Sequence, residues 1–227
     1  MVMSTGYGAG SVMEPRRPGW PAVLGPLVVP AGVVLLRPVR LRDAQHWSRI
    51  RLRDREYLER WEPTQAGDWA ERNAAWAWLS QWSTLRRLAK HGQCLPFAIT
   101  VDGGFAGQLT IGNIVRAALR SAWIGYWVSS TLAGGGVATA AVALATDHAF
   151  GQAGLHRLEA TVRPENTASL RVLDKVGYRK EGLFLRYLDV QGAWRDHLCY
   201  AITAEEVGDG LVTRLVDSGR ATLPEQR

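Results

Sequence analysis

The sequence has few of the features that mark several common classes of protein. It contains only two cysteines, Cys94 and Cys199, which are far apart and form no CxxC motif. This excludes a disulfide-stapled secreted scaffold, suggests no zinc site, and predicts two free thiols in a reducing cytoplasm. No run of Lys or Arg is longer than a pair, and no helix-turn-helix or RNA-binding signature is present. We therefore expect no metal ion and no direct contact with nucleic acid.

The sequence also lacks an uninterrupted apolar run. Arg16 and Arg17 precede an apolar stretch at residues 20–36 that superficially resembles a secretory signal, but three prolines and two glycines interrupt it. Arg37 ends the stretch before it reaches the ~20 residues that a membrane-spanning helix needs. We predict a flexible Gly/Pro-rich extension over residues 1–30, no membrane association, and a cytoplasmic protein.

The length and composition of the chain indicate one globular domain with short extensions. The 227 residues are 47% hydrophobic and 21% charged, which is enough apolar material for a sizeable core. We expect a domain at residues 31–205 and a C-terminal helix and tail at residues 206–227. The formal net charge of +6 favours an anionic ligand, without choosing among a nucleic acid, a membrane surface and a phosphorylated cofactor.

Hydrophobic periodicity predicts helices in the first half of the chain. Residues 38–60 have helical spacing with Asp43 as a candidate N-cap, and residues 69–91 form the longest helical segment, between Asp68 and Gly92. This segment carries a stripe of apolar residues that fits either core packing, which we favour, or an aromatic substrate wall. The stripe consists of Trp78, Leu79, Trp82 and Leu85.

The period then changes to that of strands joined by short turns. Three successive strands, separated by turn signals such as Asp102-Gly103-Gly104, predict an antiparallel meander. Small residues at helical spacing predict a helix over residues 137–149, with His148 as a core histidine, and a short helix follows at residues 166–176. The fold class is therefore mixed α/β, with an antiparallel-dominated sheet flanked by helices. The expected strands are 33–37, 95–101, 105–115, 121–128, 156–162, 178–188 and 194–202.

A glycine-rich turn at residues 133–139 lies between a strand and a helix. Backbone N–H groups at such a turn, together with the positive end of the helix dipole, suit a phosphate or pyrophosphate; the alternative is a turn with no ligand. The turn lacks the Gly-Lys-Ser/Thr of a Walker A loop. It also follows a meander in mid-chain, whereas a dinucleotide-binding loop opens a parallel βαβ unit.

The turn is similar to one in a known family. GNAT N-acetyltransferases carry Q/R-x-x-G-x-G/A after their fourth strand; Gly136 and Ala138 match the last two fixed positions, and Ala133 replaces the Gln or Arg. Other segments resemble the RimJ/RimL branch, the ribosomal-protein-alanine N-acetyltransferases, over about residues 33–203. They read LRP at 36–38, DA at 43–44, RPENTAS at 163–169, KVGY at 175–178 and WRDH at 194–197.

The resemblance implies a GNAT fold whose fourth and fifth strands splay apart, with acetyl-CoA as cosubstrate and its pantetheine arm between them. The backbone of Tyr126, Trp127 and Val128 would hold that arm, with the Val128 N–H near the thioester oxygen. Asn166 would contact the arm, cap its helix, or do both. The resemblance assigns the pyrophosphate to Gly134, Gly135, Gly136, Val137, Ala138 and Thr139.

The resemblance leaves proton transfer only partly assigned. Ser169 is the catalytic candidate, as donor to the leaving thiol, because Leu173 stands where some GNAT enzymes have a tyrosine. Leu188 stands where the RimL pattern has a glutamate base, and the adjacent Asp189 should face the other side of its strand, so no base is assigned. Water or an acid from one loop is the alternative. The acids of that loop are Glu56, Glu59 and Glu62.

A site without an obvious base suits one class of amine. Deprotonating a peptide α-amine at pH 7 costs about 1 kcal/mol, whereas a lysine amine costs about 4.6 kcal/mol. We therefore predict acetyl transfer to a protein or peptide N-terminus, possible targets including a ribosomal protein, by a monomer or homodimer. The alternatives are a small-molecule amine acetyltransferase acting on aminoglycosides or polyamines, and a non-catalytic acyl-CoA-binding sensor.

Overall fold

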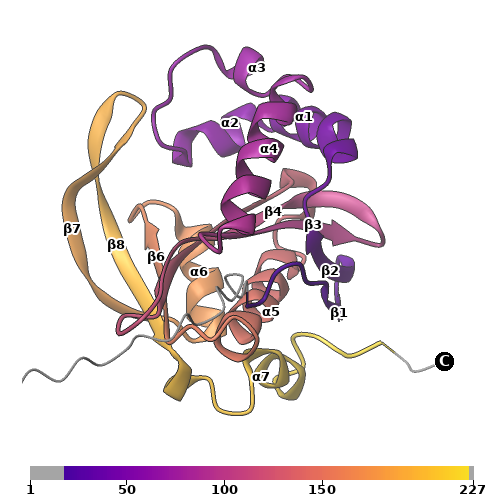
Figure 1. Cartoon of the computed structure of the whole chain (residues 1–227), viewed down its shortest axis with the longest axis vertical. Coiled ribbons are helices and arrows are strands. Elements are labelled where there is room, and N and C mark those ends of the chain that lie inside the picture. The colour runs from indigo at the N-terminus through magenta and orange to yellow at the C-terminus, as the bar shows by residue number, and fades with distance from the viewer. Residues whose placement is uncertain (1–17, 225–227) are drawn as a thin grey trace, which may run out of the picture.

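The structure is a computed structural model that describes residues 18–224. One eight-stranded sheet has the order β1-β2-β3-β4-β5-β6-β8-β7 and carries helices on both faces (Figure 1). β5 and β6 pair in parallel, and the other neighbouring strands pair antiparallel. The strands are β1 (Leu24–Val29), β2 (Gly32–Pro38), β3 (Leu95–Val101), β4 (Gly104–Val115), β5 (Ser121–Val128), β6 (Arg157–Val162), β7 (Arg179–Val190) and β8 (Ala193–Thr203). The predicted mixed α/β fold and its meander are confirmed.

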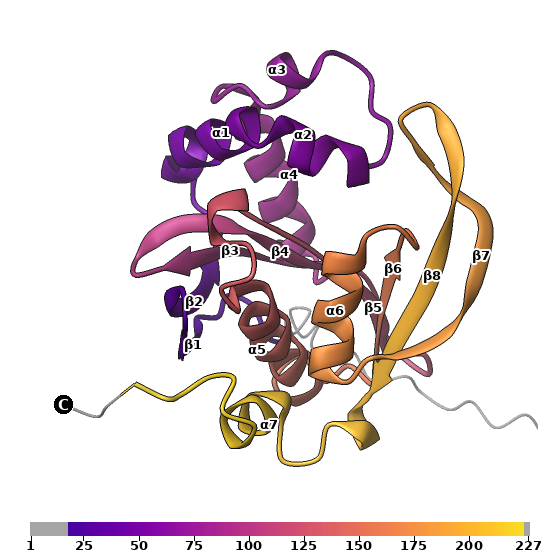
Figure 2. The same ribbon diagram turned by 180° about the vertical axis from the view of Figure 1, so that it is seen from behind.

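The helices form two layers. Figures 1 and 2 show α1 to α4 over one face of the sheet, and α5, α6 and α7 over the other. Their α-helical bounds are α1 (Ala44–Arg53), α2 (Arg55–Leu58), α3 (Trp69–Arg72), α4 (Ala77–Lys90), α5 (Val137–Gly151), α6 (Thr167–Val176) and α7 (Leu211–Asp217), with four short 3-10 turns between elements. The helical spacing predicted over residues 38–60 corresponds to α1, α2 and two of these turns.

The sheet begins earlier than the sequence predicted. β1 lies inside the segment expected to be a flexible extension and pairs with β2, whereas residues 1–17 lie outside the described residues. Thr222 in the C-terminal tail exchanges two backbone hydrogen bonds with Val28, at 2.8 and 2.9 Å. The prolines and glycines of this segment indicated coil, so β1 was not predicted. An edge strand tolerates proline because one side of its backbone has no strand to pair with.

The long helix predicted at residues 69–91 is wrong, because α3 ends at Arg72 and α4 begins at Ala77. Asn73 stops α3: its side-chain Nδ2 donates to the Trp69 carbonyl at 2.8 Å, and its Oδ1 accepts from Arg51 Nε. An asparagine that bonds to nearby backbone competes with helical hydrogen bonding. The predicted cap Asp68 is confirmed by its hydrogen bond from the Ala70 N–H at 2.7 Å.

Two other expectations about the first half of the chain need correction. In the predicted stripe Trp78 is fully buried and Trp82 and Leu85 pack against its cluster, but Leu79 is 56% exposed because it lies about 100° around the helix from Trp78. Asp43 precedes α1 but makes no capping bond to it. Its carboxylate instead pairs with Arg37 at 2.7 Å and accepts from the Arg40 N–H at 2.8 Å, which ties the end of β2 to the first helix.

α5 packs across the sheet because its residues are small and apolar on almost every side. Eleven of its fifteen residues are buried. His148 is among them, with Nε2 2.8 Å from the Gly19 carbonyl oxygen, so the predicted core histidine is confirmed. Asp147 accepts from the N–H groups of Leu211 and Val212 at 2.8 and 2.9 Å, which fixes the start of α7 against α5.

We expect Gly107→Ala to destabilise the chain by about 3 kcal/mol and to lower the melting temperature by roughly 6–12 °C. A Cβ at Gly107 would lie 2.2 Å from the Trp127 carbonyl oxygen and 2.9 Å from the Val128 Cα, so β5 would have to move. Thermal unfolding followed by circular dichroism measures the shift. Gly104→Ala on the same strand is the control, because its Cβ would make only an ordinary 3.4 Å contact. Equal melting temperatures for both variants would contradict the prediction.

Candidate active site

The sheet opens between β5 and β6. The two strands pair only from Ser121↔Arg157 to Trp123↔Glu159, so the remainder of β5 has no β6 partner. The Ser129 N–H donates to the Ala106 carbonyl at 2.8 Å, so Ala106 and Ser129 form a hydrogen-bonded pair between β4 and β5. Two residues along the ladder, Gln108 and Trp127 form the next bonded pair. Because bonded residues alternate in an antiparallel pair, the backbone N–H and C=O of Tyr126 and Val128 point away from β4. They face the opening, where an extended ligand can add as a strand.

The glycine-rich turn lies beside this opening. Gly136 is the N-cap residue of α5 with φ of +86°, and no side chain caps this helix end. The Ala140 N–H donates to the Gly136 carbonyl at 3.0 Å, so the N–H groups of Val137, Ala138 and Thr139 precede the first intrahelical bond. Free N–H groups at the positive end of a fifteen-residue helix form a site for an anion such as pyrophosphate.

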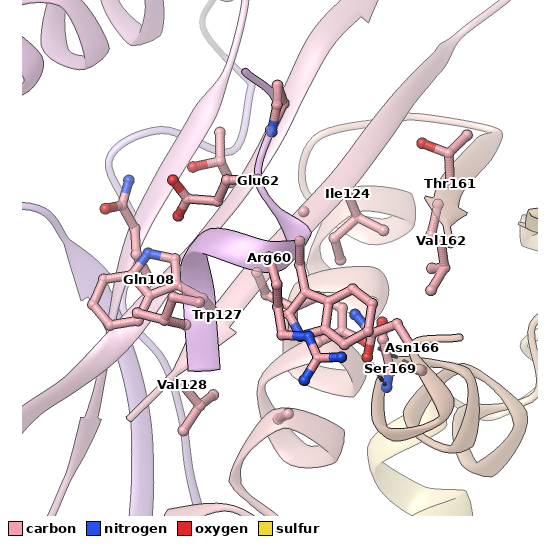
Figure 3. A pocket seen from close by; sticks show the side chains of 18 of the residues that line it. Arg60, Glu62, Gln108, Ile124, Trp127, Val128, Thr161, Val162, Asn166 and Ser169 are labelled. Carbon is pink, nitrogen blue, oxygen red and sulfur yellow. Dashed lines mark hydrogen bonds between the residues drawn. The ribbon is translucent and has the colours of Figure 1, made fainter. Parts of the chain in front are cut away.

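Most of the predicted cofactor residues line one cleft of about 1890 Å³. Figure 3 shows Trp127 and Val128 on one side of it, and Thr161 and Val162 on the other. Gly135 does not line it: its carbonyl accepts from the Ala31 N–H at 3.1 Å, and it packs against Ala31. The predicted residues that line the cleft are Tyr126, Trp127, Val128, Gly134, Gly136, Val137, Ala138, Thr139, Asn166 and Ser169.

α6 places two polar side chains at the cleft. The Asn166 side chain caps α6 by accepting from the Ser169 N–H at 3.1 Å (Figure 3). The Ser169 Oγ lies 3.0 Å from the Tyr126 hydroxyl, and either group can donate. Burial raises the pKa of Tyr126 to about 12, so its phenol remains protonated at neutral pH. Sequence reasoning had assigned only the backbone of Tyr126, because a strand residue gives no sign of contact with a helix 43 positions later.

The other residues considered for proton transfer lie in different places. Leu188 lines the cleft, whereas the Asp189 carboxylate accepts from the Thr64 hydroxyl at 2.7 Å. Both cysteines are buried free thiols outside the cleft lining. Burial raises the pKa of the Cys94 thiol to about 11 and also raises that of Cys199, which disfavours either as a thiolate nucleophile.

The structure brings one loop acid into the cleft. Glu62 lines it, whereas Glu56 and Glu59 do not. The Glu62 carboxylate pairs with Arg51 Nη2 at 2.6 Å, and both side chains are largely buried. The sequence offered three acids at similar spacing and had no signal to separate them, because Arg51, the partner of Glu62, lies 11 residues earlier on α1.

A coenzyme A molecule fits the residues present. The unpaired strand edge at Tyr126 and Val128 suits an extended amide-containing arm, and the start of α5 suits its pyrophosphate. Residues 34–179 match the acetyltransferase (GNAT) domain family. The chain belongs to the GNAT acetyltransferase family. It is an acetyl-CoA-dependent N-acetyltransferase, as the sequence predicted.

Relatives of this acetyltransferase support the assignment. The chain is 32% identical over 170 residues to the "probable N-acetyltransferase YjcK" of Bacillus subtilis, covering 74% of this chain and 93% of that protein. It is 25% identical over 175 residues to the [ribosomal protein uS5]-alanine N-acetyltransferase of Escherichia coli, covering 76% and 89%. The structure of Mycobacterium smegmatis RimJ in complex with CoA-disulfide aligns with a TM-score of 0.90 and 61% identity, covering 91% of this chain and 99% of RimJ.

Within residues 18–224, this acetyltransferase has no helix that is both long enough and apolar enough to cross a membrane.

Proposed function

We propose that this GNAT enzyme acetylates the N-terminal α-amine of a protein, with a ribosomal protein as the expected acceptor. The observation that carries the proposal is the likeness to RimJ over 91% of the chain. The Escherichia coli relative, whose name gives ribosomal protein uS5 as its acceptor, supports the same class of substrate. Leu188, which cannot act as a base, occupies the position where a glutamate base is expected. An α-amine suits such a site because its low pKa leaves part of it unprotonated near pH 7.

The chain's own residues would bind the cofactor, stabilise the developing negative charge and donate a proton to the leaving group. Acetyl-CoA supplies an activated acetyl thioester. Val137, Ala138 and Thr139 would bind its pyrophosphate through backbone N–H groups, and Asn166 would contact the pantetheine arm. The Val128 N–H would donate to the acyl oxygen as negative charge builds on it, and a preorganised donor of this kind is worth about 3 kcal/mol. Ser169, supported by Tyr126, would donate to the leaving sulfur. No covalent enzyme nucleophile is needed.

Free-thiol release from acetyl-CoA tests the proposal. The acceptors are peptides beginning with Ala, Ser or Met, the same peptides with blocked α-amines, aminoglycosides and polyamines. We expect release with free peptides and none with blocked ones. Release with small amines alone would replace the proposal with a small-molecule acetyltransferase. Calorimetric binding of CoA without thiol release for any acceptor would favour an acyl-CoA sensor.

A further inference from the structure

Residues 61–67, here called the strap, line part of the cleft at every position except Thr64. They connect the end of the α2 region to α3, on the side of the sheet opposite α5 and α6 (Figures 1 and 2). The cofactor residues at the start of α5 lie on the other side of the opening. A group that reaches the acyl carbon from the side opposite the cofactor therefore enters beneath the strap.

Tertiary contacts hold the strap at two positions, Trp61 and Thr64. At its start the Trp61 ring contacts the guanidinium groups of Arg60 and Arg163, whose carbons lie 4.6 and 5.5 Å from the ring centroid. Further along, Thr64 bonds to the turn of the β7–β8 hairpin. Its N–H donates to the Asp189 carbonyl at 2.8 Å, and its Oγ1 accepts from the Gly192 N–H at 2.9 Å. These contacts connect segments about 100 to 130 residues apart in sequence.

Glu62, between these two anchors, is held by a buried arginine. The Arg51 side chain is only 8% exposed, and its guanidinium carbon lies 4.8 to 5.5 Å from the ring centroids of Trp47, Trp69 and Trp127. Its Nε donates to Asn73. A carboxylate held by so constrained a partner has a fixed position, and burying an ion pair is costly unless its geometry is well satisfied.

Three other carboxylates line the described cleft, and each is placed differently. Glu159 pairs with Arg157 at 2.7 Å, where β5 and β6 are still paired. The side chain of Glu165 is 61% exposed and pairs with Arg163 at 3.2 Å. Glu71 is an exposed residue of α3. Glu62 is the one that combines a buried partner with a position between the strap anchors.

We propose that the Glu62 carboxylate binds the acceptor amine by accepting a hydrogen bond from it. The inference rests on the proposed function and assigns this residue of the site to acceptor recognition. Glu62, Trp127 and Val128 line the same cleft, and Figure 3 shows Trp127 between the other two. Arg51 offsets the charge of Glu62, so the carboxylate accepts the bond without strongly stabilising the protonated form of the amine. A neutral amine is the form that attacks.

The test compares two peptides that differ only in the amine. One begins with a free α-amine, and the other carries hydrogen in place of the amino group. Calorimetry in saturating CoA, which has no acetyl group to donate, gives a dissociation constant for each peptide. We expect the wild-type chain to prefer the amine by about tenfold to a hundredfold, as a hydrogen bond to a charged group allows.

Glu62→Gln should reduce this preference to less than threefold and raise the KM for peptide more than it lowers kcat. Glu62→Asp should restore part of the preference. Glutamine preserves the volume and an acceptor oxygen for Arg51, so CoA affinity should stay at the wild-type value, whereas the melting temperature should fall because the buried Arg51 guanidinium loses its counter-charge. Glu56→Gln is the control, because it removes the same charge from an exposed residue of α2 outside the cleft lining.

An unchanged preference in Glu62→Gln would overturn the inference, as would a wild-type chain with no preference. Failure of the proposed function gives a different result. The wild-type chain would then release no thiol with any free peptide, and the inference would fall with it.

Discussion

Replacing Gly136 with valine is expected to lower the affinity for CoA by about two to three orders of magnitude. Gly136 has φ of +86°, and a β-branched residue in this region costs about 1–3 kcal/mol. A Cβ there would also lie 3.1 Å from the Val29 Cβ, so the turn would have to shift. The shift would move the N–H groups that begin α5, and each hydrogen bond to a charged group is worth about 1.5–3 kcal/mol.

Titration calorimetry with CoA measures this loss. Gly151→Ala is the matched control: it adds a methyl group at the other end of α5, where nothing lies within 4 Å of the new Cβ. We expect Gly151→Ala to bind CoA like the wild type. Desulfo-CoA should lose affinity for Gly136→Val by the same factor, because the predicted damage is at the pyrophosphate. A variant that folds and binds CoA within threefold of wild type would show that the turn does not hold the cofactor.

Removing the Ser169 hydroxyl is expected to lower kcat by about 10- to 100-fold. This rate effect is at or below the lower end of the range for a general acid, because a thiol with pKa near 8.5 is a good leaving group even without a proton donor. Tyr126→Phe should cause a smaller loss, since the Tyr126 hydroxyl is 3.0 Å from the Ser169 Oγ and orients it. The double variant should be no slower than Ser169→Ala, because Tyr126 acts through Ser169.

Single-turnover acetylation of a peptide separates this loss from substrate binding. Ser169→Thr, which keeps a hydroxyl, is the control and should retain most of the rate. Because burial raises the pKa of Tyr126 to about 12, removing its phenol should leave the pH–rate profile unchanged between pH 6 and 9. A wild-type single-turnover rate in Ser169→Ala would remove this residue from the mechanism.

Several features of the fold follow from local sequence. The turn at Asp102-Gly103 joins β3 to β4, and Gln191-Gly192 joins β7 to β8, because glycine allows a tight reversal between strands. Gly177, with φ of +90°, ends α6 as a left-handed C-cap. The glycine-rich turn before α5 was visible for the same reason: its conformation depends on residues next to one another.

Other features needed partners that are distant in sequence. Asn73 divides the predicted long helix because its side chain bonds to Arg51, 22 residues earlier, and to the Trp69 carbonyl, and helical periodicity records neither contact. β1 was missed because its prolines and glycines indicate coil, whereas pairing with β2 and Thr222 stabilises it as a strand. In both cases tertiary contacts outweighed local propensity.

The sequence by itself predicted the family, the antiparallel meander and the residues that we propose to hold the cofactor. These depend on short contiguous segments, chiefly residues 133–139 and 163–169, whose backbone conformation is set by glycines and a capping asparagine. Only the tertiary structure singled out Glu62, the residue that we propose for acceptor recognition. Glu62 was one of three equivalent acids in sequence, and it enters the cleft because Arg51, buried among three tryptophans from different elements, holds it there.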